Sequence, residues 1–322
     1  MPNPTDSRVL ADVSAAAVDT YLPGLIDLFF NSNPLWIRMA SKERMVLDGG
    51  DKVRQPILYD RLNVDSYTGQ DTFDISRRPT KTVMQFDWAQ YWTNLTVDGT
   101  TLIKTSGSGS RILDLVESEM ETGRLSLSNR LGTDLFLDGT GNSSKNILGL
   151  IAAVDDGTNV LTYGGMTRDS SVQGTAVKGN LNTTGGALSL ALVNTAMGAA
   201  TIQPNRPDLI VTTQAMWDRF WERSQPAQRE PSGPGFDDLA RVGFSAINFN
   251  GAAVVIDSHV ASGNAWLLNT DFFKLLIHRD REFTFTGFQK PTNQDVMVGQ
   301  ILWAGQLVCT SPRLNTRMTG LT

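Results

Sequence analysis

The residues most able to act as a base near neutral pH are the two histidines of the chain, His259 and His278. The first of them ends the run Asp257-Ser258-His259, which contains the three residue types of a hydrolase triad. Adjacent residues of a strand point to opposite faces, so these side chains are not expected to hydrogen-bond as a triad requires. We therefore predict a structural role for this run, no catalytic residue and no enzymatic activity.

Metal and cofactor chemistry has little support in the sequence. The single cysteine, Cys309, ends an apolar stretch and is expected to be a small core residue, and one cysteine with two distant histidines lacks the spacing of a zinc site. Asp155-Asp156 could contact a cation, although a solvated loop explains this pair equally well. The GSGS run at 107–110 lacks the lysine of a phosphate loop and is interpreted as a linker, so the sequence predicts no metal and no cofactor.

The composition is that of a globular protein without a strong nucleic-acid signature. The 322 residues include 28 basic and 33 acidic side chains, a net charge of -5, so the basic surplus of a nucleic-acid reader is missing. A single cysteine excludes an internal disulfide, and an intracellular origin is the default expectation. The first residues lack the order of a signal peptide. The apolar stretch 21–30, interrupted by Pro23 and Asp27, is shorter than the roughly 20 residues of a membrane span.

The longest regular pattern is a helical one from Ser110 to Leu137. Its apolar positions recur at steps of four or seven, the period of one helix face. They are Ile112, Val116, Met120, Leu127, Leu131 and Leu135, with Gly123 in the intervening place. Ser108 or Ser110 can cap the start, and Gly139 can end the helix. At about 1.5 Å per residue the helix would run roughly 40 Å, so we expect it to be a spine for the surrounding strands.

The first 45 or so residues are interpreted as an arm with one helical piece, which a Pro-Gly pair at 23–24 breaks in two. A cluster of large apolar side chains follows around a turn. Its members are Phe29, Phe30, Leu35 and Trp36. Such a cluster near a terminus needs a surface to bury against. That surface is either the chain's own domain or a neighbouring subunit, and the sequence leaves both open.

Two predicted strands form a long excursion before the helix. The first runs from Lys52 to Tyr59 and contains Pro56, which confines it to a sheet edge or a bulge. The second is predicted from Thr80 to Val97, and the segment between them is polar and rich in turn residues. In the second strand, period two places Phe86, Trp88 and Trp92 on one face and Asp87 and Tyr91 on the other.

This excursion is expected to contact another protein surface. From Asp51 to Asp87 the chain has six basic and six acidic residues, and aromatic side chains lie near the end of this segment. Buried aromatic anchors with charges around them are typical of protein interfaces. A solvated loop is the alternative interpretation.

The second half of the chain has the pattern of a mixed α/β region. Residues 142–186 are rich in Gly, Ser, Thr and Asn and are interpreted as a surface insertion or a crossover into a second domain. The elements predicted after it are a helix over 189–202, a strand over 208–212, a helix over 215–224 capped by Thr213 with Trp217, Phe220 and Trp221 on one face, an exposed loop over 225–238, a hairpin around Asn250-Gly251, and strands over 282–288 and 300–309. The last two strands are expected to return to the long helix.

This order of parts resembles the major capsid proteins of tailed double-stranded DNA bacteriophages, which have the Hong Kong 97-type fold. The resemblance rests on KVRQPILY with TVMQFDWAQYW, on LVESEMETGRLSLSNRLGTDLFLDGTG running into ILGLIAAV, and on DFFKLLIHRDREFTFTGF followed by GQILWAGQLVCTSPRLN. It implies an α+β fold with five parts. They are an N-terminal arm (1–48), an extended β-hairpin loop (49–100), a peripheral domain with the spine helix (101–150), a mixed α/β axial domain (151–280) and returning strands of the peripheral domain (281–322).

The resemblance implies a structural protein that self-assembles into hexamers and pentamers of an icosahedral shell around double-stranded DNA. Expected partners are other copies of the chain, portal and scaffolding proteins and decoration proteins, with DNA enclosed but not read by sequence, and no membrane. The expected location is the virion capsid, assembled in the host bacterial cytoplasm. The side chains expected at subunit interfaces are Trp36 in the arm, Arg61, Arg77 and Arg78 against acidic partners, and Trp88, Tyr91 and Trp92 as anchors of the excursion.

Two other interpretations are kept. An encapsulin-like nanocompartment shell has the same fold and would hold enzyme cargo in place of a genome. A soluble α/β enzyme or a sugar-binding module that uses the helix with Trp217 and Trp221 is the alternative from a different class. A monomer with a ligand-filled pocket would favour the latter.

Overall fold

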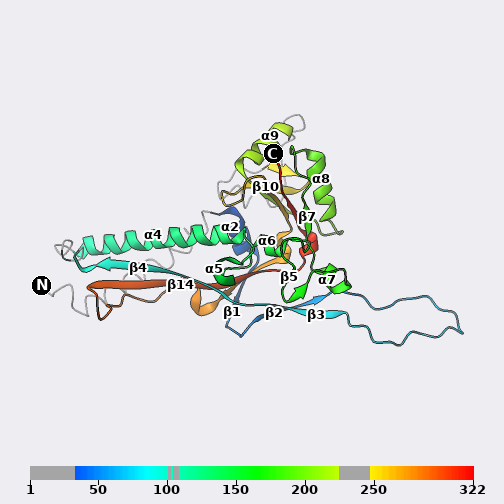
Figure 1. Ribbon diagram of the computed structural model, residues 1–322, viewed down its shortest axis with the longest axis horizontal. Helices are drawn as coiled ribbons and strands as arrows, with labels where there is room; N and C mark the ends of the chain where they lie inside the picture. The colour runs from blue at the N-terminus through cyan, green and yellow to red at the C-terminus, as the bar shows by residue number, and fades with distance from the viewer. Residues whose placement is uncertain (1–32, 101–102, 104–108, 225–246) are drawn as a thin grey trace.

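A computed structural model describes residues 33–100, 103, 109–224 and 247–322. The predicted arm helix, Phe29 and Phe30 of the aromatic cluster, and the loop predicted over 225–238 lie outside the described residues. Within the described residues the chain builds a five-stranded sheet, a six-stranded sheet and two pairs of strands. Figure 1 shows an elongated arm on one side, a thin ribbon on the other and a lobe above both.

The arm consists of the five-stranded sheet and the long helix α4. The strands are β1 (Arg44–Leu47), β4 (Ala89–Asp98), β12 (Phe273–His278), β13 (Thr284–Phe285) and β14 (Val296–Cys309), with short 3-10 turns at Thr270–Phe272, Arg279–Arg281 and Pro312–Leu314. The order is β1-β12-β14-β13, and β4 pairs antiparallel with β14 from Asp98 opposite Val296 to Ala89 opposite Gly305. The predicted return of the last strand to the long helix is confirmed, because β14 and β4 run together beneath α4 (Figure 1).

Helix α4 (Gly109–Leu135) confirms the helix predicted over 110–137. Its buried side chains include Met120, Leu127, Leu131 and Leu135, as the apolar period requires. A Cβ at Gly123 would lie 2.6 Å from Cδ2 of Leu95 on β4. A larger residue at Gly123 would therefore push the helix away from the strand.

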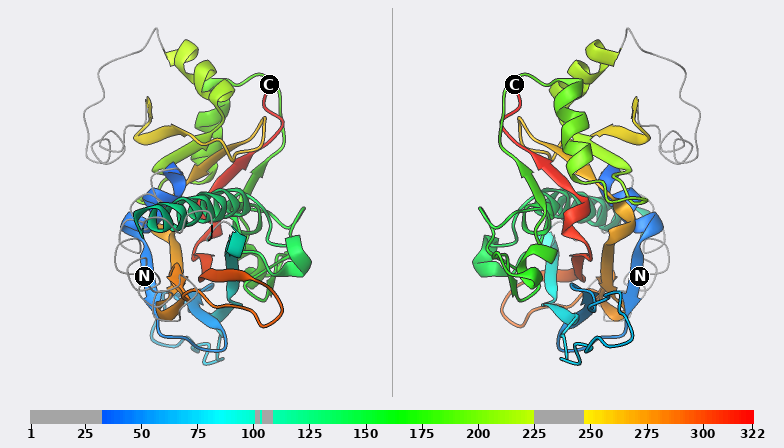
Figure 2. Two further views of the ribbon diagram at one scale, coloured as in Figure 1. Left: turned by 90° about the vertical axis from the view of Figure 1, so that its left-hand side faces the viewer. Right: turned by 90° about the vertical axis from the view of Figure 1, so that its right-hand side faces the viewer.

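The lobe is built on the six-stranded sheet. In spatial order its strands are β7 (Asn180–Asn182), β15 (Thr316–Met318), β11 (Ala265–Leu268), β8 (Leu209–Thr212), β10 (Ala252–Ile256) and β9 (Ile247–Phe249). Helices α8 (Leu190–Ala199) and α9 (Gln214–Ser224) pack on one face through a separate apolar cluster (Figure 2). The predicted helices and the strand over 208–212 are confirmed. So is the β9–β10 hairpin, whose Asn250 and Gly251 have φ of 50° and 86°, as a tight primed turn requires.

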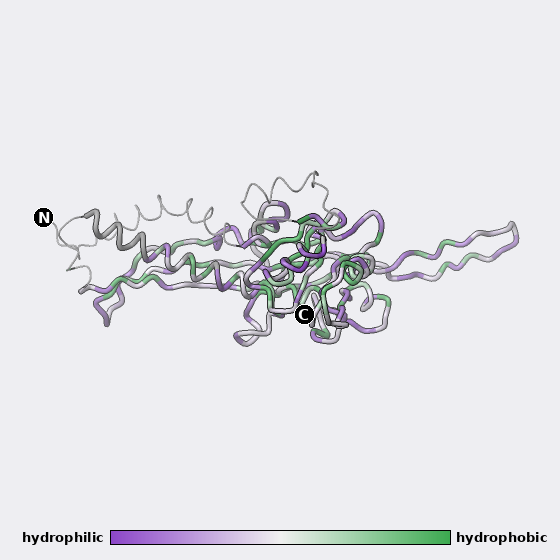
Figure 3. The backbone as a smooth tube through the Cα atoms, turned by 90° about the horizontal axis from the view of Figure 1, so that it is seen from above, coloured by the Kyte–Doolittle hydropathy of each residue, from purple (hydrophilic) through white to green (hydrophobic). Residues whose placement is uncertain are grey.

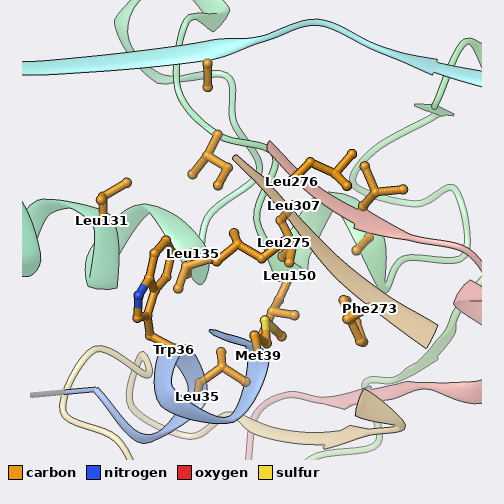
Figure 4. Packing of buried hydrophobic residues seen from close by; sticks show 14 of the residues in the cluster. Leu35, Trp36, Met39, Leu131, Leu135, Leu150, Phe273, Leu275, Leu276 and Leu307 are labelled. Carbon is orange, nitrogen blue, oxygen red and sulfur yellow. The ribbon is translucent and has the colours of Figure 1, made fainter. Parts of the chain in front are cut away.

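The main core lies where α2 (Pro34–Lys42), α4, the five-stranded sheet and the other face of the six-stranded sheet meet. Trp36 of α2 points toward Leu131 and Leu135 of α4, and Met39 of α2 lies beside Leu150 (Figure 4). Trp303 of β14 is fully buried, with its ring centroid 6.0 Å from that of Trp36. The helix, the arm and the lobe therefore share one apolar core.

The Gly- and Ser-rich segment folds against this core as a series of short elements. They are α5 (Gly141–Ser144), α6 (Leu150–Ala153), β5 (Thr162–Tyr163), β6 (Met166–Thr167) and α7 (Val172–Ala176). Arg168 fastens them, because its guanidinium donates to the carbonyl oxygens of Ala152 at 2.7 Å, Ala153 at 3.0 Å, Val160 at 3.1 Å and Val177 at 2.9 Å. One buried cation thus provides hydrogen-bond donors for carbonyl groups at the C-terminal end of α6 and in two other parts of the segment.

The ribbon consists of β2 (Val53–Leu58) and β3 (Lys81–Phe86), and residues 59–80 extend from it far beyond the body (Figures 1 and 3). The single strand predicted over 80–97 is wrong. The chain leaves the ribbon at Asp87 and Trp88 and continues as β4 in the five-stranded sheet. Because β4 pairs with β14, that pairing and not the pairing of β3 decides which residues of β4 face the core. On β4, Tyr91 is buried and Trp92 is exposed. The prediction placed Trp92 on the same face as Phe86, but Phe86 on β3 is buried.

Candidate subunit interface

The base of the ribbon is fixed to the body by its inner face. Val53, Met84 and Phe86 are buried, and the Phe86 ring lies edge-on to Tyr163 with 5.2 Å between centroids. The backbone N–H of Gln85 donates to the carbonyl oxygen of Gly164 at 3.0 Å. The ribbon therefore leaves the body in a defined direction.

Exposed apolar side chains recur along the outer face of the ribbon and of the loop beyond it. Alternate residues of an extended chain point to one side, and this alternation assigns six exposed apolar side chains to one face of the two runs, with Asp60, Arg77 and Lys81 between them. We call this set the apolar stripe. Its members, with exposed fractions, are Leu58 (64%), Leu62 (68%), Val64 (90%), Phe73 (66%), Ile75 (95%) and Val83 (43%). Figure 3 shows the alternation of hydrophobic and hydrophilic residues along both runs of the loop.

The opposite face of the loop is polar and hydrogen-bonded within itself. The Asn63 amide donates to Asp74 Oδ2 at 3.1 Å, and the Ser76 N–H donates to Asp74 Oδ1 at 2.9 Å. At the tip, the Thr68 N–H donates to Asp71 Oδ2 at 2.8 Å. Hydrogen bonds from Ser76 and from Thr68 lower the pKa of Asp74 and of Asp71, respectively. These contacts organise the loop before any partner binds.

The three arginines predicted at an interface all lie on this loop. Arg61, Arg77 and Arg78 are exposed. None of them forms an ion pair within the part of the chain that the structure describes, although the charge of Arg78 contributes to the lowered pKa of Asp74. Three cationic side chains thus accompany the apolar stripe.

Trp88 lies at the root of the ribbon. Its Nε1–H donates to the carbonyl oxygen of Gly50 at 2.9 Å, and its ring lies edge-on to His278 with 5.6 Å between centroids. Gly49 and Gly50 have φ of 126° and 127°, a conformation that other residues rarely adopt. Trp88 therefore anchors the ribbon to its own chain.

Trp36 and Tyr91 are core residues of the single chain, which corrects the prediction of an interface position for both. Trp36 is 2% exposed. The Tyr91 hydroxyl donates to Asp134 Oδ2 at 2.8 Å and accepts from the Ile147 N–H at 2.9 Å. Burial is the first cause of the raised pKa of Tyr91. The predicted faces of 80–97 were reversed for Tyr91 because the strand breaks before it.

Replacing Tyr91 by Phe is expected to lower the free energy of unfolding by about 2 kcal/mol, because the buried Asp134 carboxylate keeps only its Arg130 donor and the buried Ile147 N–H loses its acceptor. Urea unfolding of the unassembled chain measures this. Tyr67→Phe is the control, since Tyr67 is 67% exposed and should leave stability unchanged. Equal stabilities of the Tyr91 and Tyr67 variants would contradict the assigned hydrogen bonds.

Trp92 occupies an open sheet face. It is 64% exposed on the side of β4 that faces away from α4, directly across from Leu302 of β14. The other exposed residues of this face on β4 are Gln90, Asn94, Thr96 and Asp98. An exposed tryptophan among small polar side chains is a typical anchor point for a protein partner.

The Asp257-Ser258-His259 run forms a pair and not a triad. The prediction that these side chains do not hydrogen-bond to one another is wrong for Asp257 and His259. The run lies in a turn after β10, and Asp257 Oδ1 is 3.0 Å from His259 Nδ1. The other ring nitrogen, Nε2, is 3.1 Å from Asn129 Oδ1 of α4, so no hydroxyl nucleophile faces it. The geometry is that of a structural contact between the lobe and the helix.

Other residues considered for chemistry are structural. Cys309 is fully buried, as predicted, and burial raises the pKa of its thiol to about 12. Asp155 is also buried, and it accepts from the N–H groups of Gly157, Asn159 and Val160. Within the described residues no three His, Cys, Asp or Glu side chains gather as metal ligands, and no helix has the length and apolar character needed to cross a membrane.

The apolar stripe was missed from the sequence. The segment between the two predicted strands has many polar and turn residues, and on that ground it was interpreted as a polar excursion. The alternation of apolar and polar residues at 62–65 and 73–76 is the signal that could have identified it.

The chain is similar in fold to solved subunits of phage capsids and of an encapsulin. The chain is similar to a protein of the cyanophage A-1(L) capsid asymmetric unit, with a TM-score of 0.67, 14% identity, and coverage of 90% of this chain and 93% of that one. The capsid of Myoviridae phage XM1 gives a TM-score of 0.55 at 10% identity over 86% and 89% of the two chains. The holo-SrpI encapsulin complex of Synechococcus elongatus gives 0.57 at 11% identity over 89% and 88%.

These similarities extend over nearly the whole chain, and they identify a mixed α/β chain with the Hong Kong 97-type fold of phage major capsid proteins. The resemblance noted from the sequence is therefore confirmed at the level of the fold. No protein-family model and no curated protein matches the sequence.

Proposed function

We propose that this protein is a major capsid protein, a structural and non-enzymatic subunit that assembles into hexamers and pentamers of an icosahedral shell around double-stranded DNA. The observation that carries the proposal is the apolar stripe, whose six large side chains stay exposed on an ordered ribbon. A soluble monomer rarely exposes this many apolar side chains on one segment, and a subunit interface would cover them. The shared fold with capsid subunits supports the same role.

In this proposal the parts of the chain take the roles known from the fold. The ribbon with residues 59–80 is the extended loop, the arm with α4 is the peripheral domain, and the lobe is the axial domain. Portal, scaffolding and decoration proteins are proposed partners, and the proposed location is the virion, after assembly in the bacterial cytoplasm. The net charge of -5 suits a shell that encloses DNA without binding it tightly.

The open face around Trp92 is the proposed receptor for the apolar stripe of a neighbouring copy. The ribbon and the arm project from opposite sides of the body (Figure 3), so successive copies can join head to tail. Such heterologous contacts generate closed rings when the rotation between copies closes. Arg61, Arg77 and Arg78 are proposed to meet acidic groups at the rim of this contact, where charges set the register.

Electron microscopy and sedimentation velocity of the purified chain test this function. The wild type is expected to form capsomer rings or closed shells. Trp92→Ala should raise the concentration needed for assembly by roughly thirtyfold, the effect of losing a central aromatic anchor. Leu161→Ala is the matched control, because Leu161 is an apolar side chain, 58% exposed, that belongs neither to the open face of β4 nor to the apolar stripe.

The outcomes separate two claims. Compact monomers of the wild type under all assembly conditions would contradict the capsid function. Normal shells from Trp92→Ala would contradict only the proposed receptor face.

A nanocompartment shell is the second candidate, because the encapsulin structure aligns with the chain about as well as the capsid of phage XM1 does. The content of shells purified from cells decides between the two functions. Nucleic acid protected from nuclease supports a phage capsid, and a stoichiometric protein cargo supports an encapsulin-like compartment.

A further inference from the structure

The turn between β9 and β10 contains Asn250-Gly251, the only Asn-Gly pair of the sequence. Asparagine followed by glycine is the pair of residues most prone to deamidate, because glycine has no side chain to keep its backbone nitrogen away from the asparagine amide. Both residues are exposed, and Asn250 lines an open hollow of about 680 Å³. Water therefore reaches the pair.

Deamidation of such a pair needs no reagent other than water. The Gly251 nitrogen loses its proton and forms a bond with Cγ of Asn250, and the side-chain nitrogen of Asn250 takes up a proton and leaves as ammonia. The product of this step is a five-membered succinimide ring. Water then opens the ring at Cγ, which gives aspartate, or at the backbone carbonyl carbon, which gives isoaspartate.

The structure restrains both groups that would form the ring. The Gly251 N–H donates to Asn248 Oδ1 at 2.9 Å, and Asn250 Nδ2 lies 3.4 Å from Sδ of Met197 on α8. The Gly251 nitrogen can attack only after its hydrogen bond to Asn248 is broken, because that bond holds the proton that has to leave. The contact with Met197 restricts the side chain that is attacked.

The position of Asn248 suits this restraint. Its side chain is exposed on β9, and the Gly251 N–H is its hydrogen-bond partner among the described residues. Asn250 and Gly251 have φ of 50° and 86°, and the flanking residues Phe249 and Ala252 are paired across the turn. This pairing keeps Asn248 within reach of Gly251.

Deamidation would change both the turn and the hollow beside it. Isoaspartate adds one atom to the backbone of a two-residue turn, so the register of Phe249 opposite Ala252 would be lost. Aspartate would add a carboxylate to a hollow that Arg206 also lines. Arg206 forms no ion pair with any other residue that the structure describes, so the new carboxylate would meet an unpaired guanidinium.

We propose that Asn250 is a deamidation site of the lobe and that Asn248 protects it by holding the Gly251 N–H. The edge of the six-stranded sheet, where β9 lies, then ages by reaction with water at a rate that Asn248 sets. The inference does not depend on the capsid function, because it concerns one turn within one chain.

Mass spectrometry of the peptide that contains Asn250 tests the proposal, after incubation of the full chain at mildly alkaline pH in one assembly state. Deamidation raises the mass because OH replaces NH₂. Asn248→Ala should deamidate at Asn250 about fivefold faster than the wild type, the effect of losing one hydrogen bond. Asn248→Asp is the matched control, since its carboxylate still accepts from the Gly251 N–H, and it should react no faster than the wild type.

Two further measurements separate the restraint from a general loosening of the chain. Asn142, which is exposed, has φ of 52° and precedes Ser143, should deamidate at one rate in all variants. The wild type unfolded in urea should react at Asn250 at least as fast as folded Asn248→Ala, because unfolding removes both contacts. Equal rates at Asn250 in the folded wild type and in Asn248→Ala, or acceleration at Asn142 as well, would overturn the proposal.

Discussion

A Val64→Asp, Ile75→Asp double variant is expected to fold as the wild type does and to remain unassembled. These two side chains of the apolar stripe are 90% and 95% exposed, so the single chain loses no contact when they are replaced. In an assembled shell each new carboxylate would be buried without a partner. That costs about 4 kcal/mol or more at every contact, roughly a thousandfold in affinity.

Sedimentation velocity and electron microscopy measure the loss of assembly, and thermal unfolding measures the retained fold. The matched control is Gln70→Asp, Thr72→Asp, which adds the same charge to exposed positions of the same loop outside the apolar stripe and leaves the hydrogen bonds to Asp74 intact. We expect this control to assemble. If the stripe variant forms normal shells, the apolar stripe is not a subunit interface. If both variants fail to assemble, the added charge on the loop is responsible, wherever on the loop it lies.

The parts of the fold that could be predicted from the sequence are those with a long, uninterrupted period. The α4 helix was predictable because its apolar positions repeat over more than twenty residues with one consistent face. The β9–β10 hairpin was predictable because Asn250-Gly251 suits only a few turn geometries. Each of these signals is local, so no knowledge of the tertiary contacts was needed.

The strand break at Asp87 and Trp88 depends on contacts that are distant in sequence. Residues 80–97 have an unbroken strand pattern, and the division arises because β3 pairs with β2 while β4 pairs with β14, some 200 residues later. A one-residue change of alternation between the two strands then moved Tyr91 into the core and Trp92 to the surface. The interface residues could not be assigned without that pairing.

The Asp257–His259 pair and the role of Arg168 were also beyond the sequence. The strand argument against hydrogen bonding at 257–259 failed because the chain turns directly after β10. Arg168 is buried, and its four acceptors are backbone carbonyls, which have no signature in a sequence. Such contacts are visible only once the loops are placed.

Arg168→Met is expected to lower the free energy of unfolding by roughly 4 kcal/mol, because several buried carbonyl groups lose their only charged donor at once. Methionine keeps much of the apolar length of the side chain, so lost packing is a minor part of the effect. The guanidinium also lies 5.0 Å from the centre of the Tyr163 ring, and this contact is lost as well. Arg168→Lys should recover only a small part, since an ammonium cannot reach carbonyls in four directions.

Urea unfolding should be measured in the Val64→Asp, Ile75→Asp background, where assembly does not add to the apparent stability. Arg206→Met is the control, because Arg206 is exposed and its replacement should change stability by less than about 0.5 kcal/mol. If the inserted segment unfolded alone, a separate transition would appear at low urea concentration. The amides over 150–180 would then exchange faster than the other amides. A stability equal to that of the Arg206 variant would mean that water replaces the guanidinium at no cost, and the segment would then be held by its apolar contacts, not by this cation.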